Sequence, residues 1–181
     1  MPTVPAGLSA ALLALALVAG DASAQGWRER LQQARQASRE PATQPPQLPA
    51  GTRALVDIAY GDDARQRFDA YLPARPVPGA PVILFVHGGG WANGNKDNPG
   101  VVEGKAGQWL PKGSVLVSTN YRLRPATAPL DQARDVARAL AQVQRMAPDW
   151  GADPARVVLM GHSAGAHLAA LVGASPALWR E

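Results

Sequence analysis

Short apolar runs alternate with longer helical patterns between residues 54 and 174 of this chain. The run at residues 82–86 is apolar at every position, which is typical of a strand buried on both faces of a sheet. Similar short runs, bounded by turn residues, predict four further strands. The predicted strands are residues 54–60, 67–72, 82–86, 115–119 and 156–160.

Between these strands the apolar positions recur every three and four residues. Residues 130–146 follow this spacing, so we expect an amphipathic helix there. Residues 101–110 and 164–172 are also predicted to be helical. Strands separated by helices of this length imply crossover connections. We therefore expect an α/β fold with a mostly parallel sheet and crossover helices.

The beginning of the chain has a different pattern. Residues 8–18 form an uncharged apolar run, and the small-x-small sequence Ala22-Ser23-Ala24 follows it. The run is shorter than the roughly 20 residues of a membrane span. Residues 1–24 therefore predict a secretory signal peptide, and with it an exported protein, periplasmic or secreted, that keeps no stable membrane span after cleavage. An uncleaved N-terminal anchor is the alternative.

Residues 25–53 are rich in Pro, Gln and Arg and predict a linker, with a short helix at residues 27–40 at most. The formal net charge is +4, and several arginines lie in this linker without aromatic residues between them. That arrangement favours a solvated tail over a nucleic-acid-binding surface. The folded domain is predicted to occupy residues 54–181.

The composition also excludes some kinds of site. The chain has no cysteine, so disulfides and thiolate zinc sites are impossible. Its three histidines have no accompanying carboxylate pair, which argues against a metal site. The glycine-rich residues 88–96 match neither of the common nucleotide-binding patterns. We expect neither a metal nor a cofactor.

One candidate nucleophile lies between the last predicted strand and the last predicted helix. The sequence there is Gly161-His162-Ser163-Ala164-Gly165, the Gly-x-Ser-x-Gly pattern of a nucleophile elbow. Strand and helix approach closely at such a turn, which leaves no room for side chains at the two glycines. The helix that follows points its N-terminal amides toward a developing oxyanion, and the Ala164 N–H is the natural donor.

A second motif, His87-Gly88-Gly89-Gly90-Trp91, directly follows the buried strand at residues 82–86. Three successive glycines let backbone N–H groups approach a substrate more closely than any β-carbon would permit. This loop predicts the other half of an oxyanion hole. The sequence does not decide which two of the three glycines donate.

With these motifs the chain resembles the α/β-hydrolase superfamily, in particular its carboxylesterase and hormone-sensitive-lipase-like branch. The resemblance covers residues 54–174, and its details are closest to exported feruloyl or acetyl-xylan esterase-like and kynurenine-formamidase-like members. The motifs that carry it are Asp69-Ala-Tyr-Leu-Pro73, His87-Gly-Gly-Gly-Trp91, Asn120-Tyr-Arg-Leu123 and Gly161-His-Ser-Ala-Gly-Ala-His-Leu-Ala169.

The resemblance implies a serine hydrolase with Ser163 as nucleophile and strands one to five of the family's fold. We expect it to cleave carboxylic esters through an acyl-enzyme, on a small-molecule or carbohydrate-linked substrate. An arylformamidase-like amide hydrolase is the alternative chemistry. In similar proteins the histidine before the glycines braces their loop, and this is the expected role of His87, which is also a candidate pocket residue.

Other polar and aromatic residues in or near the motifs are expected to have roles outside a catalytic triad. Trp91 is expected either to form a wall of the acyl pocket or to anchor the glycine loop, and His162 is a candidate pocket residue. His167 is expected to pack or to form hydrogen bonds, and Asp135 and Asp153 are expected to be structural. None of these residues is placed to act as the base of a catalytic triad.

Acyl transfer by serine needs a base and a carboxylate that orients it. In this fold they follow the serine in the order Asp or Glu, then His. We therefore expect both to lie beyond Glu181 and the chain to be C-terminally truncated, with an open apolar strand edge at residues 157–160. The alternative is a non-catalytic remnant, or a piece that depends on a partner.

Overall fold

The computed structural model describes residues 26–30, 32, 44–75, 77–175 and 177. The chain divides into two compact units, Met1–Ala37 and Ser38–Glu181. In the first unit the described residues, 26–30 and 32, are helical. The predicted signal peptide lies outside the described residues, as does most of the predicted helix at 27–40. Within the described ranges, no helix has the length and apolar character that crossing a membrane requires.

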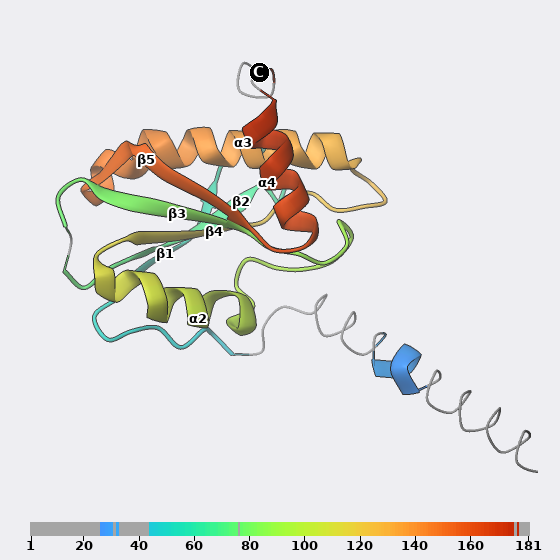
Figure 1. Ribbon diagram of the computed structural model, residues 1–181, viewed down its shortest axis with the longest axis horizontal. Coiled ribbons are helices and arrows are strands. Elements are labelled where there is room, and N and C mark those ends of the chain that lie inside the picture. Colours follow the sequence, from blue (N-terminus) through green and yellow to red (C-terminus); the bar gives the residue numbers. More distant parts are fainter. Residues whose placement is uncertain (1–25, 31, 33–43, 76, 176, 178–181) are drawn as a thin grey trace, which may run out of the picture. The chain divides into compact units, whose positions relative to one another are not determined.

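A five-stranded sheet forms the centre of the second unit, in the order β1-β2-β4-β3-β5 (Figure 1). All five strands were predicted close to their observed positions. Their bounds are β1 Arg53–Ala59, β2 Arg67–Leu72, β3 Ala80–Val86, β4 Val115–Thr119 and β5 Ala152–Gly161.

The sheet is mixed. β2 is antiparallel to both β1 and β4, whereas β3 is parallel to β4 and to β5. Four strands therefore run in one direction and only β2 runs in the other, because the turn after β1 closes a hairpin. The predicted α/β class with crossover helices is confirmed.

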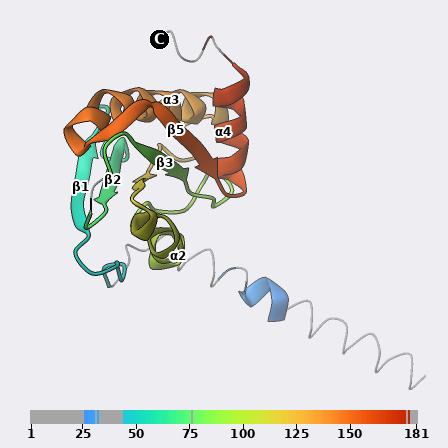
Figure 2. The same cartoon turned by 60° about the vertical axis from the view of Figure 1, so that its left-hand side comes forward.

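Helices cover both faces of this sheet. Helix α2 (Pro99–Trp109) connects β3 to β4, and α3 (Pro129–Met146) connects β4 to β5. Helix α4 (Ala164–Ala174) follows β5 and contacts α3. Helices α3 and α4 lie on one face and α2 on the opposite face (Figures 1 and 2). Short 3-10 turns, Leu110–Lys112 and Ala147–Trp150, end α2 and α3.

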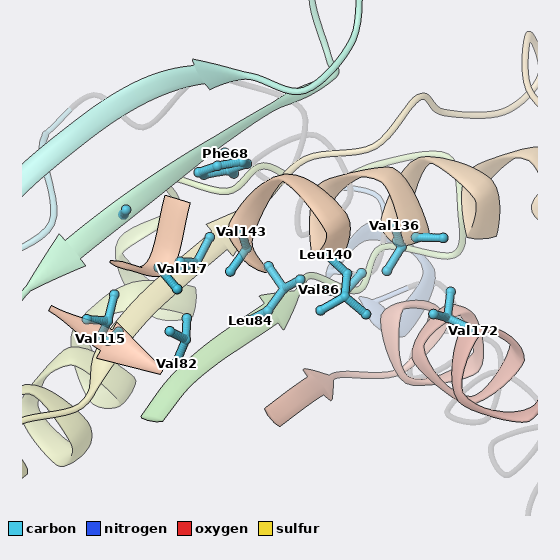
Figure 3. Close-up of a cluster of buried hydrophobic side chains, with 14 of the residues drawn as sticks. Phe68, Val82, Leu84, Val86, Val115, Val117, Val136, Leu140, Val143 and Val172 are labelled. Carbon is cyan, nitrogen blue, oxygen red and sulfur yellow. The ribbon is translucent and has the colours of Figure 1, made fainter. Parts of the chain in front are cut away.

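Each face has its own apolar core, as the period of two along a strand requires. In β3, Val82, Leu84 and Val86 point toward α3 and α4, and Figure 3 shows them among the valines of β4 and α3. Ile83 and Phe85 point to the other side and pack against α2. Burial on both faces explains why this strand is apolar at every position.

The parallel pair β3 and β5 brings two distant loops together. Val86 at the end of β3 is in register with Gly161 at the end of β5. Because parallel strands end at the same edge of a sheet, the loops that follow them lie next to each other there. The two sequence motifs occupy these loops.

Strand β5 is longer than predicted. Its first residue, Ala152, pairs with Ala80 before a register shift, so Asp153 and Pro154 lie within the strand. Within the described residues β5 pairs with β3 alone and is the last strand of the sheet. The side chain of Val158 is 49% exposed.

Candidate active site

Ser163 occupies a sharp bend between β5 and α4. Its backbone has φ 52° and ψ −119°, a conformation that non-glycine residues rarely adopt. Strain of this kind persists only where the surrounding structure holds it, and it is concentrated at functional sites. The residue is exposed, so the bend presents its hydroxyl at the surface.

The glycines on either side of Ser163 are needed because backbone passes close to them. A β-carbon on Gly161 would overlap the backbone of Gly165 at the start of α4. A β-carbon on Gly165 would overlap the carbonyl oxygens of Val86 and His87 at the end of β3. The second glycine therefore lets the first turn of α4 lie directly on the loop after β3.

The glycine loop, residues 87–91, lies against this bend. The His162 N–H donates to the Val86 carbonyl oxygen at 3.2 Å, which continues the pairing with β3 one residue beyond the end of β5. A β-carbon on Gly88 would be 2.9 Å from the His162 carbonyl oxygen and 3.3 Å from Ser163 Cβ. The two motifs, more than 70 residues apart in the sequence, are thus in contact.

Several backbone amides at this contact have no hydrogen-bond partner among the described residues. Among the described residues, no hydrogen bond is donated by the N–H of Gly88, Gly89 or Gly90. Ala164 is the first residue of α4, where N–H groups have no partner inside the helix and the helix dipole is positive. Together these groups could bind an anionic oxygen beside the Ser163 hydroxyl.

His87 braces the glycine loop from behind. Its side chain is buried, with Nδ1 2.7 Å from the Gly88 carbonyl oxygen and Nε2 3.4 Å from Arg65 Nη2. The ring stacks on Tyr121 at 4.6 Å, and the Tyr121 hydroxyl donates to the His87 carbonyl oxygen at 3.0 Å. Burial lowers the pKa of His87 to about 4, so the ring is neutral at neutral pH.

Trp91 anchors the far end of the same loop. Its carbonyl oxygen accepts hydrogen bonds from Gln132 Nε2 at 2.8 Å and from the Arg124 N–H at 2.9 Å. Its indole meets the His167 ring edge-on, with the ring centroids 5.5 Å apart. Trp91 itself has φ 62°, so a second strained residue is held in this region.

His162 and His167 are both exposed, on either side of Ser163 along the chain. His162 lines a hollow of about 460 Å³ together with Gly88 and Met160, and a smaller one of about 190 Å³ with Gly89 and His87. The His167 N–H donates to the Ser163 carbonyl oxygen at 3.1 Å, as expected for the first turn of a helix.

No side chain in the described part of the chain forms a hydrogen bond with the Ser163 hydroxyl. Asp135 is engaged elsewhere: it accepts from Arg122 Nη2 at 2.7 Å and from Gln66 Nε2 at 2.8 Å. Asp153 accepts from the Ala155 N–H at 2.8 Å. The residues described contain no group of three or more His, Cys, Asp or Glu that could hold a metal ion.

Sequence reasoning missed the polar residues that hold the glycine loop from behind. Arg65 Nη2 donates to the Gly94 carbonyl oxygen at 2.8 Å and to Asn120 Oδ1 at 3.2 Å. Asn120 Oδ1 also accepts from the Lys96 N–H at 2.8 Å. Asn120 directly follows β4, at the edge of the sheet where β3 and β5 also end. Its position was the available signal, whereas nothing in the sequence marked Arg65.

Comparison with known proteins then decides the family. The model of the family described as BD-FAE matches residues 68–178, more than half of the chain. The chain belongs to the BD-FAE family. Its fold and relatives place it in the α/β-hydrolase superfamily, in the hormone-sensitive-lipase-like branch of carboxylesterases.

Two curated relatives of this BD-FAE chain show the range of the family. It is 38% identical over 114 residues to the probable isoprenylcysteine α-carbonyl methylesterase ICMEL1 of Arabidopsis thaliana, covering 62% of this chain and 23% of the plant protein. It is 34% identical over 122 residues to the kynurenine formamidase of Danio rerio, covering 67% of this chain and 39% of the fish protein.

A similar solved structure is that of esterase B from Lactobacillus rhamnosis. The TM-score is 0.64 at 26% identity, and the match covers 90% of this chain and 50% of the esterase. The chain thus spans half or less of the length of these three proteins.

Proposed function

We propose that Ser163 is the nucleophile of a carboxylic ester hydrolase. The observation that carries this proposal is the contact between the strained Ser163 bend and the glycine loop. It brings a serine hydroxyl and unpartnered backbone N–H groups to one exposed place. Acyl transfer needs this pairing of a nucleophile with donors for the oxyanion.

The proposed reaction has two steps. The Ser163 oxygen attacks the ester carbonyl carbon while its proton passes to a base, and the carbonyl oxygen becomes an oxyanion. The N–H of Ala164 and two N–H groups of the Gly88–Gly90 loop stabilise this oxyanion. Collapse expels the alcohol, which takes up the proton, and leaves an acyl-enzyme. Water then attacks the acyl-enzyme by the same route, which releases the acid and restores Ser163.

The base and the carboxylate that orients it are not among the partners of Ser163 in the described residues. In this fold they follow the nucleophile in the chain. We propose that in the whole protein an Asp or Glu and a His after residue 181 complete the triad. A chain that acts without them would retain the slow reaction that an oxyanion hole and an exposed serine support alone.

The substrate we propose is a small-molecule ester. Support comes from the esterase relatives, and a carbohydrate-linked ester is the narrower prediction from the sequence. The fish relative, a kynurenine formamidase, favours an aryl formamide as the second candidate. Both substrates would pass through the same acyl-enzyme, so the acyl and leaving groups distinguish them. We also propose export through residues 1–24, which N-terminal sequencing of the protein in periplasmic or culture fractions would test.

A fluorophosphonate probe tests the nucleophile directly. We expect it to label the 181-residue chain, with the phosphonate on the peptide that contains Ser163. The S163A variant should not be labelled, whereas S175A, at the end of α4, should be labelled at the parent rate. Labelling that persists in S163A, or no labelling of Ser163 in a chain extended to include the downstream Asp or Glu and His, would contradict the proposal and favour a non-catalytic or partner-dependent protein. Comparing the rates at which the protein hydrolyses an aryl acetate and an aryl formamide would then distinguish the two substrate classes.

A further inference from the structure

The glycine loop has a weakness that follows from its composition. Gly89 has φ 119°, and a β-carbon there would overlap the Asn93 carbonyl oxygen, so only glycine fits. Glycine, however, permits several backbone orientations at similar energy. The residues that allow close approach to Ser163 therefore do not decide which way their own N–H groups point.

His87 fixes the orientation of one of these peptide groups, the one between Gly88 and Gly89. Its Nδ1 lies 2.7 Å from the Gly88 carbonyl oxygen, and a carbonyl oxygen only accepts, so Nδ1 must carry the hydrogen. The peptide between Gly88 and Gly89 is trans, and C=O and N–H point in opposite directions across a planar trans peptide. The bond that holds the Gly88 carbonyl therefore also directs the Gly89 N–H away from the His87 ring.

Arg65 in turn faces the other nitrogen of the same ring. Its Nη2 lies 3.4 Å from His87 Nε2. A guanidinium has donors only, so this contact favours an Nε2 that presents its lone pair, in competition with Asn120 Oδ1, which accepts from the same Nη2 at 3.2 Å. The head of Arg65 is itself fixed, because Nη2 donates to the Gly94 carbonyl oxygen at 2.8 Å and Nε donates to the Tyr121 carbonyl oxygen at 3.0 Å.

We propose that Arg65 is a positioning residue for the oxyanion hole. It holds His87 in the tautomer with the hydrogen on Nδ1, and so keeps the Gly89 N–H turned toward the oxyanion. This inference rests on the proposed function, which it deepens by assigning Gly89 as one of the donors. Arg65 itself touches neither substrate nor Ser163 and acts only through the His87 ring.

Nitrogen-15 NMR of the histidine rings tests the tautomer without any activity. With three histidines in the chain, and H87N to assign the signal, His87 should show a protonated Nδ1 and an unprotonated Nε2 at neutral pH. In R65Q the glutamine oxygen can accept from Nε2, so we expect the second tautomer to become populated. R65K keeps a donor-only head and should preserve the parent tautomer. A parent ring protonated on Nε2, or an unchanged tautomer in R65Q, would overturn the proposal.

The rate of Ser163 phosphonylation gives the second readout. Losing an oxyanion donor costs roughly 10²- to 10³-fold in rate, so a donor that is misdirected part of the time should cost roughly tenfold. We expect that loss in R65Q and a smaller one in R65K. The matched control is R67Q, because Arg67 lies in the same hairpin and donates to the carbonyl oxygens of Gly61, Asp63 and Gln66, none of them in the glycine loop. R67Q should stay within about twofold of the parent rate.

A double-mutant cycle separates the tautomer from the other contacts of Arg65. The asparagine of H87N can donate to the Gly88 carbonyl oxygen but has no second ring nitrogen for Arg65 to control. In that background R65Q should change the rate less than twofold. An equal loss in both backgrounds would mean that Arg65 acts through Gly94 or Tyr121, and would overturn the proposal. If a chain extended to include the downstream triad residues is not labelled at Ser163, the nucleophile proposal fails, while the NMR result still decides the role of Arg65.

Discussion

Gly88 lies so close to Ser163 that a β-carbon on the glycine would be 3.3 Å from Ser163 Cβ. The same added carbon would be 2.9 Å from both the carbonyl oxygen and Nδ1 of His162. The backbone oxygen cannot move aside, so a side chain at this position would push the glycine loop away from the bend. The glycine loop can lie this close to Ser163 because Gly88 has no β-carbon.

The variant G88A follows from this contact. Displacing the loop should misplace the donors of the oxyanion hole, so we expect Ser163 phosphonylation to fall by roughly 10²-fold or more. The matched control is G104A, since Gly104 lies in α2 with no atom within 4 Å of an added β-carbon. It should keep the parent rate and gain about 0.5–1 kcal/mol of stability. A parent rate in G88A would show that the loop takes no part in the reaction.

An added side chain in the first turn of α4, the helix that follows Ser163, should also be poorly tolerated. In G165A the new methyl group would overlap two backbone carbonyl oxygens at the end of β3, which have no room to relax. We expect the free energy of unfolding to fall by about 3 kcal/mol, measured by urea denaturation.

The control for G165A is G173A in the same helix, where an added β-carbon meets nothing within 4 Å. Replacing glycine by alanine inside a helix should stabilise it by about 0.5–1 kcal/mol. Similar losses in the two variants would mean that α4 does not need close contact with the end of β3.

The elements of this fold could be predicted because each has a local signal. The apolar run of β3 indicates burial on both faces of the sheet. The glycines at 161 and 165 indicate that neighbouring backbone passes close to them. The α3 helix has its apolar residues on one face, and its observed bounds differ by one residue from those predicted. Strand β5 begins four residues earlier than predicted, and its extra residues, which include Pro154, lie at a register shift that no regular strand pattern would reveal.

The support behind the glycine loop could not be predicted in the same way. Arg65, Lys96 and Asn120 come from three separate segments. Asn120 opens one of the recognised motifs, but nothing in the sequence indicates that the three side chains meet. They meet because β2, β3 and β4 are neighbours in the sheet, so the contacts depend on topology. The motif residues of the site were therefore recognisable, while the residues that hold them in place were not.

Lys96 illustrates such hidden support. Its Nζ lies 2.7 Å from Asp69 Oδ1 and 2.9 Å from Asp57 Oδ1, and both Lys96 and Asp69 are buried. Burial alone would lower the pKa of Lys96, but the hydrogen bonds to Asp69 and Asp57 outweigh it and raise the pKa above the usual value. The ammonium therefore stays charged and ties the segment after the glycine loop to β2.

Replacing this lysine should be costly. K96M leaves the Asp69 carboxylate buried without its cation, and we expect the free energy of unfolding to fall by about 3 kcal/mol in urea denaturation. K96M/D69N should recover at least about 1 kcal/mol, because the uncompensated charge is gone. K112M, at an exposed lysine, should change stability by less than about 0.5 kcal/mol. A K96M variant as stable as K112M would show that the ion pair contributes nothing.

The buried His87 should make the stability of the fold depend on pH. The pKa of His87 is lowered from 6.5 to about 4, chiefly by burial and also by the charge of Arg65, while the hydrogen bonds to the Gly88 carbonyl and to Asn120 oppose this shift. The stacked Tyr121 stays neutral, since burial raises its pKa to about 12. As the pH falls from 6.5 to 4, the unfolded chain binds a proton at His87 that the folded chain does not. The free energy of unfolding must therefore decrease across this window, by about 1.4 kcal/mol per pH unit from this group.

Comparing the parent with H87N isolates that contribution, because the acidic residues titrate in both. The free energy of unfolding, measured by urea denaturation, should fall less steeply in H87N between pH 6.5 and 4. The difference from the parent corresponds to about one proton, or about 3 kcal/mol over the whole window. Equal slopes in the parent and H87N would mean that His87 accepts a proton in the folded state. The Nδ1 donor and the Nε2 lone pair that the glycine loop and Arg65 require could then not coexist on a neutral ring.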